Sequence, residues 1–131
     1  MSVTQNKELV LGFFSDIATG RIQEALDRMA EDLRFTLIGT TRFSGVCKSR
    51  KEFVDQILAP LGAQLEGSLN ITTENLIAEG DFVVAQSHGG STTRKGGSYD
   101  NTYCHVFRIA DGKIREVTEY LDTELITTAL G

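Results

Sequence analysis

The chain has 131 residues, a net charge of -5 and a hydrophobic fraction of 40%. This length and composition predict one domain over residues 1–131 with a buried core, and they exclude an intrinsically disordered chain. The 13 Lys and Arg against 18 Asp and Glu argue against a nucleic-acid partner. With no apolar stretch of membrane-spanning length and no leader-like start, we expect a cytoplasmic protein without a membrane partner.

The first part of the chain has the periodicity of helices. Ser2 and Gln5 have the spacing of a capping box, and apolar residues recur after them at helical intervals as far as Gly20. A shorter apolar stripe at residues 22–29 predicts a second helix that ends near Glu31 and Asp32. The pattern then becomes strand-like over residues 33–38, so a helical hairpin should lead into a strand.

A third helix is predicted after a loop at residues 39–45. Ser49 and Glu52 have capping-box spacing ahead of another apolar stripe. Pro60 and Gly62 are predicted to close this helix, because proline lacks a backbone N–H and glycine is common just beyond helix ends. The first half of the chain should therefore contain three helices.

The second half changes to β-branched runs separated by short turns. The predicted strands are residues 69–78, 82–93, 99–109 and 113–121, and a short final helix is predicted at residues 123–130. Gly89 and Gly90 lie inside the second run, where glycines often mark a bulge or bend. Antiparallel strands after a helical half predict an α+β fold, with the helices packed on one face of a strongly bent sheet to form a cone with an interior.

The cysteines and histidines are few. Cys47 and Cys104 are too isolated for a disulfide framework or a zinc cluster, so both are predicted to be free thiols. His88 and His105 lack nearby carboxylates in the sequence that would complete a metal site. We therefore predict no metal and no cofactor.

Glu119 is the first candidate for proton transfer. Strand alternation places it on the same face as Val117 and Leu121. Burial of a carboxylate between aliphatic neighbours is costly unless it is hydrogen-bonded or protonated, and such a group is suited to acid/base catalysis. The alternative is a solvent-facing residue on a half-exposed strand, and periodicity alone does not decide between the two.

Further polar candidates lie on the preceding strands. Tyr103 and His105 share a strand face with Asn101 and Phe107, so they are either core rings with satisfied polar atoms or part of a pocket. His88 is either an ordinary residue near the end of a strand or a base.

The segment YDNTYCHVFRIADGKIREVTEYLDT at residues 99–123, together with the loop at residues 39–45 and the SRKEF that starts the third helix, resembles the SnoaL-like branch of the nuclear transport factor 2-like superfamily. That branch is often labelled ketosteroid isomerase-related. The resemblance covers nearly the whole chain. It implies a cone of about three helices on a strongly bent, mixed, mostly antiparallel sheet, with a short C-terminal helix and an apolar pocket at the wide end. It also implies a homodimer formed through the outer sheet face.

The resemblance does not imply steroid isomerase activity. The general-base aspartate of the steroid isomerases falls at Thr36 or Leu37, and neither can accept a proton from carbon. Their oxyanion-hole aspartic acid falls near Tyr103 or Cys104, where only the tyrosine could donate a hydrogen bond.

Two other branches of the superfamily match in part. Glu119 is similar to one of the two carboxylates of limonene-type epoxide hydrolases, whereas their second carboxylate and its arginine fall near His88 and Gln86. The acid/base aspartate of polyketide cyclases aligns with Asp122, which is also placed to cap the final helix. Capping is the predicted role of Asp122.

Two functions are consistent with these residues. The first is cofactor-free acid/base catalysis, of the isomerase, cyclase or hydrolase type, on a small hydrophobic or polyketide-like molecule. Glu119 would transfer the proton with His88 or His105 as its partner, and Tyr103 would polarise a substrate oxygen. The substrate-binding residues would be Asn101, His105, Phe13, Phe35, Leu37 and Val117. The second is a non-catalytic dimeric protein that binds a small hydrophobic ligand, which the missing second carboxylate favours.

Overall fold

A computed structural model describes residues 2–131 of the protein. The helices are α1 (Val3–Ala18), α2 (Ile22–Asp27), α3 (Arg50–Phe53), the π-helix η1 (Val54–Leu58), α4 (Ala59–Gln64) and α5 (Thr123–Leu130). The strands are β1 (Met29–Leu37), β2 (Gly45–Cys47), β3 (Leu65–Glu66), β4 (Ile71–Glu79), β5 (Phe82–Gly89), β6 (Ser91–Thr93), β7 (Ser98–Tyr99), β8 (Thr102–Ala110) and β9 (Lys113–Leu121). Among these described helices, none combines the length and hydropathy needed to cross a bilayer.

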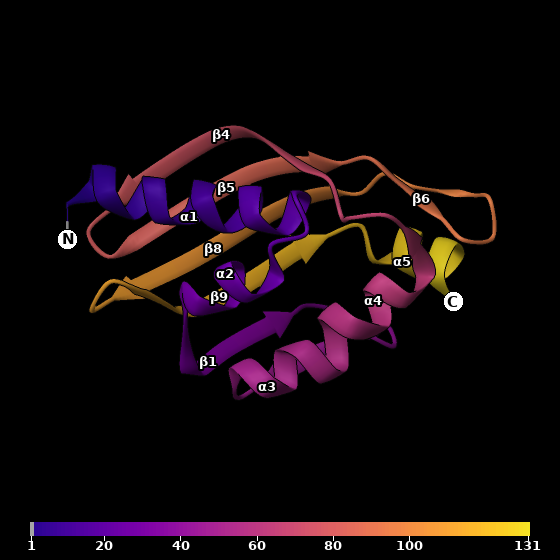
Figure 1. The fold of residues 1–131 in the computed structure, drawn as a ribbon, viewed down its shortest axis with the longest axis horizontal. Helices are drawn as coiled ribbons and strands as arrows, with labels where there is room; N and C mark the ends of the chain where they lie inside the picture. Colours follow the sequence, from indigo (N-terminus) through magenta and orange to yellow (C-terminus); the bar gives the residue numbers. More distant parts are fainter. Residues whose placement is uncertain (1) are drawn as a thin grey trace.

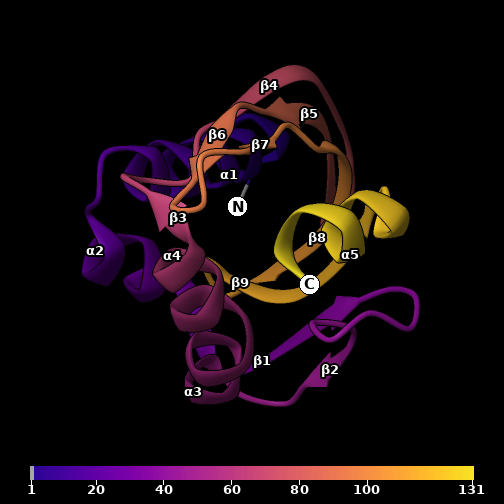
Figure 2. The same ribbon diagram turned by 90° about the vertical axis from the view of Figure 1, so that its right-hand side faces the viewer.

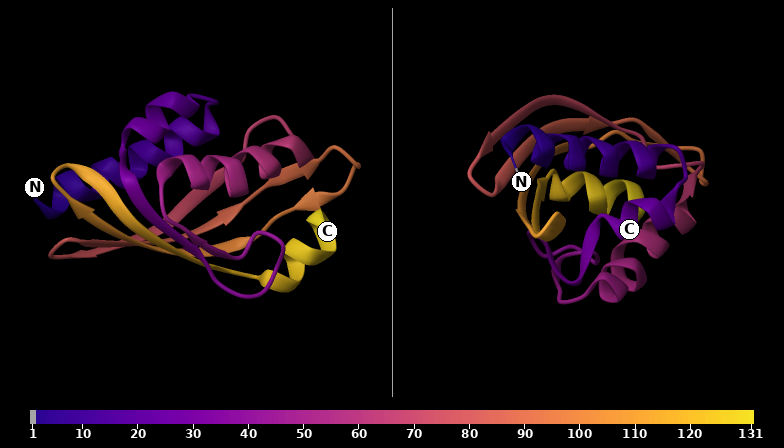
Figure 3. Two further views of the ribbon diagram at one scale, coloured as in Figure 1. Left: turned by 90° about the horizontal axis from the view of Figure 1, so that it is seen from below. Right: turned by 60° about the vertical axis from the view of Figure 1, so that its left-hand side comes forward.

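The architecture is a strongly curled sheet closed by helices. A six-stranded sheet has the order β2-β1-β9-β8-β5-β4, in which only the β1–β9 pair is parallel. Its long strands run side by side in Figure 1, and α1 to α4 lie on one face of it in the left view of Figure 3. Seen along the molecule, the strands and helices form a ring, with α5 at the end that faces the viewer (Figure 2). The predicted α+β fold with a bent, mostly antiparallel sheet is confirmed.

The first helix begins at the predicted capping box. The Ser2 hydroxyl accepts a hydrogen bond from the Gln5 N–H at 3.1 Å, and the Gln5 side chain accepts one from the Ser2 N–H at 2.9 Å. The apolar stripe that follows is buried against the sheet through Val10, Phe13, Phe14 and Ile17. This helix therefore supplies one wall of the molecule's interior.

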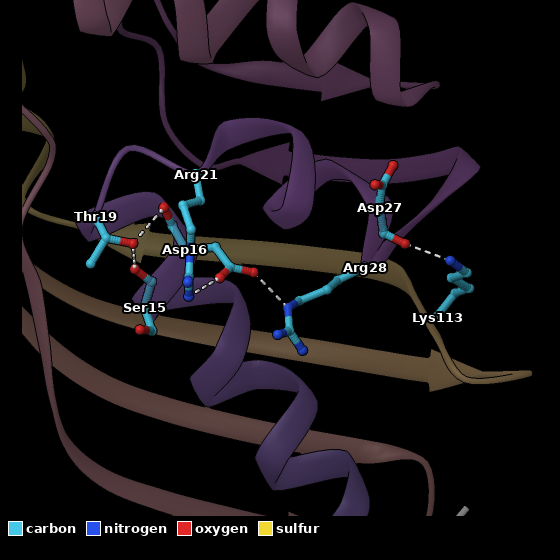
Figure 4. Close-up of polar contacts among 7 residues, drawn as sticks. All are labelled: Ser15, Asp16, Thr19, Arg21, Asp27, Arg28 and Lys113. Atoms are coloured by element: carbon cyan, nitrogen blue, oxygen red, sulfur yellow. Dashed lines mark hydrogen bonds and ion pairs between the residues drawn. The ribbon is translucent and has the colours of Figure 1, made fainter.

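A buried carboxylate fixes the turn from α1 to α2. Asp16 accepts hydrogen bonds from Arg21 at 2.9 Å and from Arg28 at 2.8 Å, as Figure 4 shows. Its side chain is 2% exposed, whereas both arginines are partly solvated. The hydrogen bond from Arg28 leads the causes that lower the pKa of Asp16, although burial opposes it. Gly12 leaves room for this arrangement, because a Cβ there would overlap the Arg28 guanidinium group.

Two predicted helix boundaries are wrong. The second helix ends at Asp27, and β1 begins at Met29 instead of residue 33, because Met29 and Leu33 are both buried in the core. The third helical segment continues beyond Pro60 to Gln64. It does so because the π-turn of η1 precedes the proline, which then lies in the first turn of α4, where a missing N–H is tolerated.

The two longest predicted strands are each interrupted near one end. β5 stops at Gly89 before β6, as the paired glycines predicted, and β7 stops at Tyr99 before β8. Gly89 permits a close approach, since a Cβ there would lie 3.2 Å from the Tyr103 ring and 3.3 Å from the Asn70 carbonyl oxygen. β6 and β7, the segments on the far side of these breaks, join β3 in a separate three-stranded sheet of order β3-β6-β7. This second sheet extends one side of the ring toward α5 (Figure 2).

Candidate functional site

The register of the β8–β9 hairpin places the candidate site. Asp111 and Gly112 form a two-residue turn with φ of 53° and 74°, which is typical of a tight hairpin. Ile109 pairs with Ile114, but the next pair is Arg108 with Glu116, so β9 carries one extra residue at this bulge. Because side chains alternate along a strand, this single shift decides which residues of β9 face inward.

Beyond the bulge, His105 and Glu119 are direct cross-strand neighbours. They form one inward-facing row with Leu37 on β1 and Ala85 on β5. Side chains in such a row have Cβ atoms about 4.5–5.5 Å apart, so two polar groups in it can make a hydrogen bond. The structure therefore pairs the carboxylate with an imidazole.

The hydrogen bond joins His105 Nε2 to Glu119 Oε2 at 2.7 Å. Both side chains are largely buried, at 5% and 11% exposed. A carboxylate oxygen accepts this hydrogen bond from an Nε2–H, and in that tautomer the other ring nitrogen, Nδ1, has a lone pair available. Within residues 2–131, His105 Nδ1 is buried without a hydrogen-bond partner. A buried nitrogen without a partner costs free energy unless a ligand or a water molecule donates a hydrogen bond to it.

Aromatic rings hold the imidazole in position. Tyr103 stacks on His105 with ring centroids 5.4 Å apart, Phe14 meets it edge-on at 5.4 Å, and Phe107 lies at 5.8 Å. These contacts limit rotation of the ring about its side-chain bonds. The low polarity of the surroundings also strengthens the interaction between His105 and Glu119.

The pair lies in the wall of an apolar cavity of about 60 Å³. Its lining includes the four apolar residues that sequence analysis assigned to substrate binding, namely Phe13, Phe35, Leu37 and Val117. Ile126 and Leu130 of α5 line it from the end of the ring that faces the viewer in Figure 2. A volume of this size admits a few waters or the reacting end of a small molecule.

Two buried phenols complete the polar part of the lining. Burial raises the pKa of Tyr103 far above its ordinary value, and the nearby Tyr99 and Glu119 raise it further. Burial also raises the pKa of Tyr99. Both phenols therefore stay protonated at neutral pH and can act as hydrogen-bond donors.

The SnoaL-like domain model matches residues 10–117. The chain belongs to the SnoaL-like family. No curated protein matches it.

Solved structures share the fold of this SnoaL-like protein. An NTF2-like protein from Burkholderia thailandensis E264 has a TM-score of 0.85 and 22% identity, over 100% of this chain and 99% of that one. Bal32a, from a soil-derived mobile gene cassette, has a TM-score of 0.87 and 19% identity, over 98% of both chains. A protein from Jannaschia sp. CCS1 named as a SnoaL-like polyketide cyclase has a TM-score of 0.82 and 22% identity, over 97% of this chain and 92% of that one. At these identities the likeness shows the fold alone.

The structure removes one predicted catalytic residue from the site of the SnoaL-like protein. His88 lies on the outer face of β5, where its side chain is 54% exposed and its Nδ1 lies 2.8 Å from Glu74 Oε1. The inward-facing neighbour is Ser87, because strand alternation turns His88 away. The prediction that His88 pairs with Glu119 in the pocket is therefore wrong, and the pair is made by His105, the alternative partner.

Asn101 is also corrected, from a substrate-binding residue to a structural one. Its amide donates to the Tyr99 hydroxyl and the Asp122 carbonyl, both at 3.1 Å. Its oxygen accepts from the Thr102 N–H at 2.8 Å and the Asp122 N–H at 3.0 Å. These bonds use its full hydrogen-bonding capacity, so none remains for a substrate. Asp122 itself caps α5, as predicted, by accepting from the Leu125 N–H at 3.2 Å.

Sequence reasoning missed two residues of the site. Tyr99 was not assigned, although it lies four residues before Tyr103 and thus has the parity of the inward-facing positions. Phe14 lies on the apolar stripe of the first helix, but helix periodicity identifies a buried face without naming its contact on the sheet. Within residues 2–131, no three His, Cys, Asp or Glu side chains gather as metal ligands.

Proposed function

We propose that this SnoaL-like protein is a cofactor-free acid/base catalyst, with His105 and Glu119 as its proton-transfer pair. The substrate would be a small hydrophobic or polyketide-like carbonyl compound. The observation that carries the proposal is the buried 2.7 Å hydrogen bond between the two residues, in an apolar cavity, with the second imidazole nitrogen unpartnered. Pockets that are mostly apolar with a few convergent polar groups are typical of small-molecule sites.

In this proposal, named atoms of the pair accept and stabilise the proton that leaves the substrate. His105 Nδ1 would take a proton from a carbon next to the substrate carbonyl, and Glu119 would stabilise the imidazolium through the Nε2–H that it already accepts. Return of the same proton to another carbon isomerises the substrate. Attack of the enolate carbon on a second carbonyl instead forms a carbon–carbon bond and closes a ring, and the alkoxide that results takes the proton back from His105. This differs from the sequence-based hypothesis, in which the carboxylate itself exchanged the proton.

The two phenols would stabilise the charge on the substrate oxygen. Tyr99 accepts a hydrogen bond from Asn101, which leaves its own proton free to be donated. Tyr103 lines the same cavity and remains protonated, because burial raises its pKa. Donors aimed at a developing oxyanion in a low-polarity site account for much of the rate enhancement in such reactions. The fold shared with a protein named as a polyketide cyclase supports ring closure as one outcome.

The simplest test is exchange of carbonyl α-protons with deuterated water. We expect the protein to accelerate exchange in 2-butanone or a cyclisable β-diketone, measured by proton nuclear magnetic resonance. His105→Asn and Glu119→Gln should each reduce the rate about 100-fold or more. His88→Asn is the matched control, because His88 is exposed and paired with Glu74, so its rate should equal that of the unmodified protein.

The second candidate function is non-catalytic binding of a hydrophobic ligand. It is favoured because, among residues 2–131, the cavity lining contains no second carboxylate beside Glu119. Saturable binding of a ketone with no acceleration of exchange, and with the ketone recovered unchanged, would establish this function and refute catalysis.

We also propose a homodimer formed through the outer face of the sheet. The centre of that face carries Val84, Val106 and Thr118 in one cross-strand row, and Phe82 and Tyr120 are exposed near it. Exposed apolar groups on a sheet face commonly mark an interface. Val106→Arg should convert the dimer to a monomer in sedimentation velocity experiments. A monomeric unmodified protein at micromolar concentration would refute the proposal.

A further inference from the structure

We infer that the ligand is elongated and neutral, with its reacting carbonyl at His105 and an apolar tail in a groove beside α4. This inference rests on the proposed function, because it adds the shape and polarity of the substrate to the same site. The groove, called the side groove below, lies between the α1–α2 turn, η1, α4 and the segment after β3. Its volume is about 330 Å³.

The side groove and the cavity share part of their walls. Ile17, Leu58, Leu61 and Leu69 line both. These four aliphatic side chains therefore form a wall that is common to both spaces. Leucine and isoleucine side chains change rotamer far more readily than a backbone element moves, so a ligand can join the two spaces without unfolding a helix or strand.

The shared wall includes an irregular helix. Leu58 ends the π-helix η1, and Val54, which begins it, also lines the side groove. Such π-turns are rare and frequently occur at functional sites. Here the π-turn precedes Pro60 and turns Ile57 and Leu58 toward the cavity.

The cavity alone is too small for a whole ligand, so the proposed ligand extends into the side groove. A cavity of about 60 Å³ holds only the reacting end of a ligand, whereas small-molecule pockets are typically about 300–1,000 Å³. At the end of the ring, Ile126 and Leu130 of α5 are 1% and 2% exposed, so α5 closes much of that side. The side groove is the adjoining space of sufficient size.

The chemistry of the side groove specifies the tail. In the described part of the chain, no residue that lines the side groove carries a charge, and apart from Ser68 the lining residues are aliphatic residues, alanine and glycines. A phosphate or carboxylate there would lose its water without gaining a partner, which is costly. The lining therefore suits an alkyl or other neutral hydrocarbon tail.

A series of ketones tests this inference directly. Titration of 15N-labelled protein with 2-butanone to 2-nonanone, followed by nuclear magnetic resonance, should give affinities that rise about threefold to fourfold for each added CH2. Gly62 lies in α4 beside the side groove with open space around a Cβ. Gly62→Trp should fill the groove and lower the ratio of the 2-nonanone to 2-butanone affinities at least tenfold.

The matched control is Gly90→Trp, since Gly90 also has open space around it but lines neither space. It should leave the affinity ratio unchanged. If Gly62→Trp does not fold, Ser68→Trp blocks the same groove from the other side. An affinity that does not rise with chain length, or an equal ratio in the groove and control variants, would overturn the inference.

Failure of the proposed function gives a different result. If the protein accelerates no α-proton exchange but the groove variants still lower the affinity ratio, the side groove binds the tail of a ligand that is not converted. If Glu119→Gln abolishes exchange and the ratio responds to neither groove variant, catalysis stands and the side groove is excluded.

Discussion

Replacement of Asp16 by asparagine should lower the free energy of unfolding by about 2–3 kcal/mol at neutral pH. Asp16 accepts charge-assisted hydrogen bonds from Arg21 and Arg28, and each such bond contributes about 1.5–3 kcal/mol. The two arginine side chains are 58% and 34% exposed, so water replaces part of the loss when the carboxylate is removed. This places the expected loss well below the sum of two full bonds.

The pH dependence follows from the lowered pKa of Asp16. A carboxylate whose pKa is lower in the folded than in the unfolded state stabilises the protein above its ordinary pKa of 3.8, and this contribution disappears as the pH falls through the folded-state value. The difference between the unmodified protein and Asp16→Asn should therefore be constant from pH 5 to pH 8 and shrink below pH 3.8.

Urea unfolding followed by circular dichroism measures this difference at each pH. Asp55→Asn is the matched control, because Asp55 pairs with Lys51 on an exposed helix surface and should cause no measurable change. The reasoning is refuted if Asp16→Asn is as stable as the unmodified protein at pH 7, or if its deficit is equally large at pH 3.

Three further outcomes are expected. Asn101→Ala should lower the free energy of unfolding by about 2–4 kcal/mol in the same urea assay, because it leaves the Thr102 and Asp122 N–H groups without their acceptor; no loss would contradict its structural role. Ser49→Ala should cost about 1 kcal/mol through loss of the α3 cap, seen as a melting temperature a few degrees lower. Tyr103→Phe should slow α-proton exchange about tenfold. Because burial raises the pKa of Tyr103, the exchange rate of the unmodified protein should not fall through phenol ionisation between pH 8 and pH 10. A fall in the rate over that range would count against a buried phenol donor.

The helices and the tight turns were predictable because their signals are local. The Ser2 and Ser49 caps form the predicted side-chain to backbone hydrogen bonds, although Glu52 bonds to the N–H of Lys48, one residue earlier than in a capping box. The Asp111 turn needs positive φ at two successive positions, which aspartate and glycine tolerate. Such features depend on a few neighbouring residues.

The error at His88 arose because a catalytic role was assigned to this residue before the face of the strand on which it lies was known. Val83, Ala85 and Ser87 are the inward-facing residues of β5, so residues of even number in this strand face outward. The alternation was present in the sequence, and Gly89 and Gly90 predicted a bulge or bend directly after His88. Only pairing with β4 and β8 shows that the alternation continues to the end of the strand.

By itself, the sequence determined the α+β class, the family resemblance and the hairpin turn at Asp111, because these depend on local patterns. It also placed Glu119 on one face with Val117. Only the tertiary structure decided that His105 meets Glu119, since their contact depends on the register after the β-bulge, and one residue of slip reverses every inward and outward position. The wall that the cavity shares with the side groove likewise comes from segments that are distant in the chain. Local periodicity does not encode the contacts between such segments.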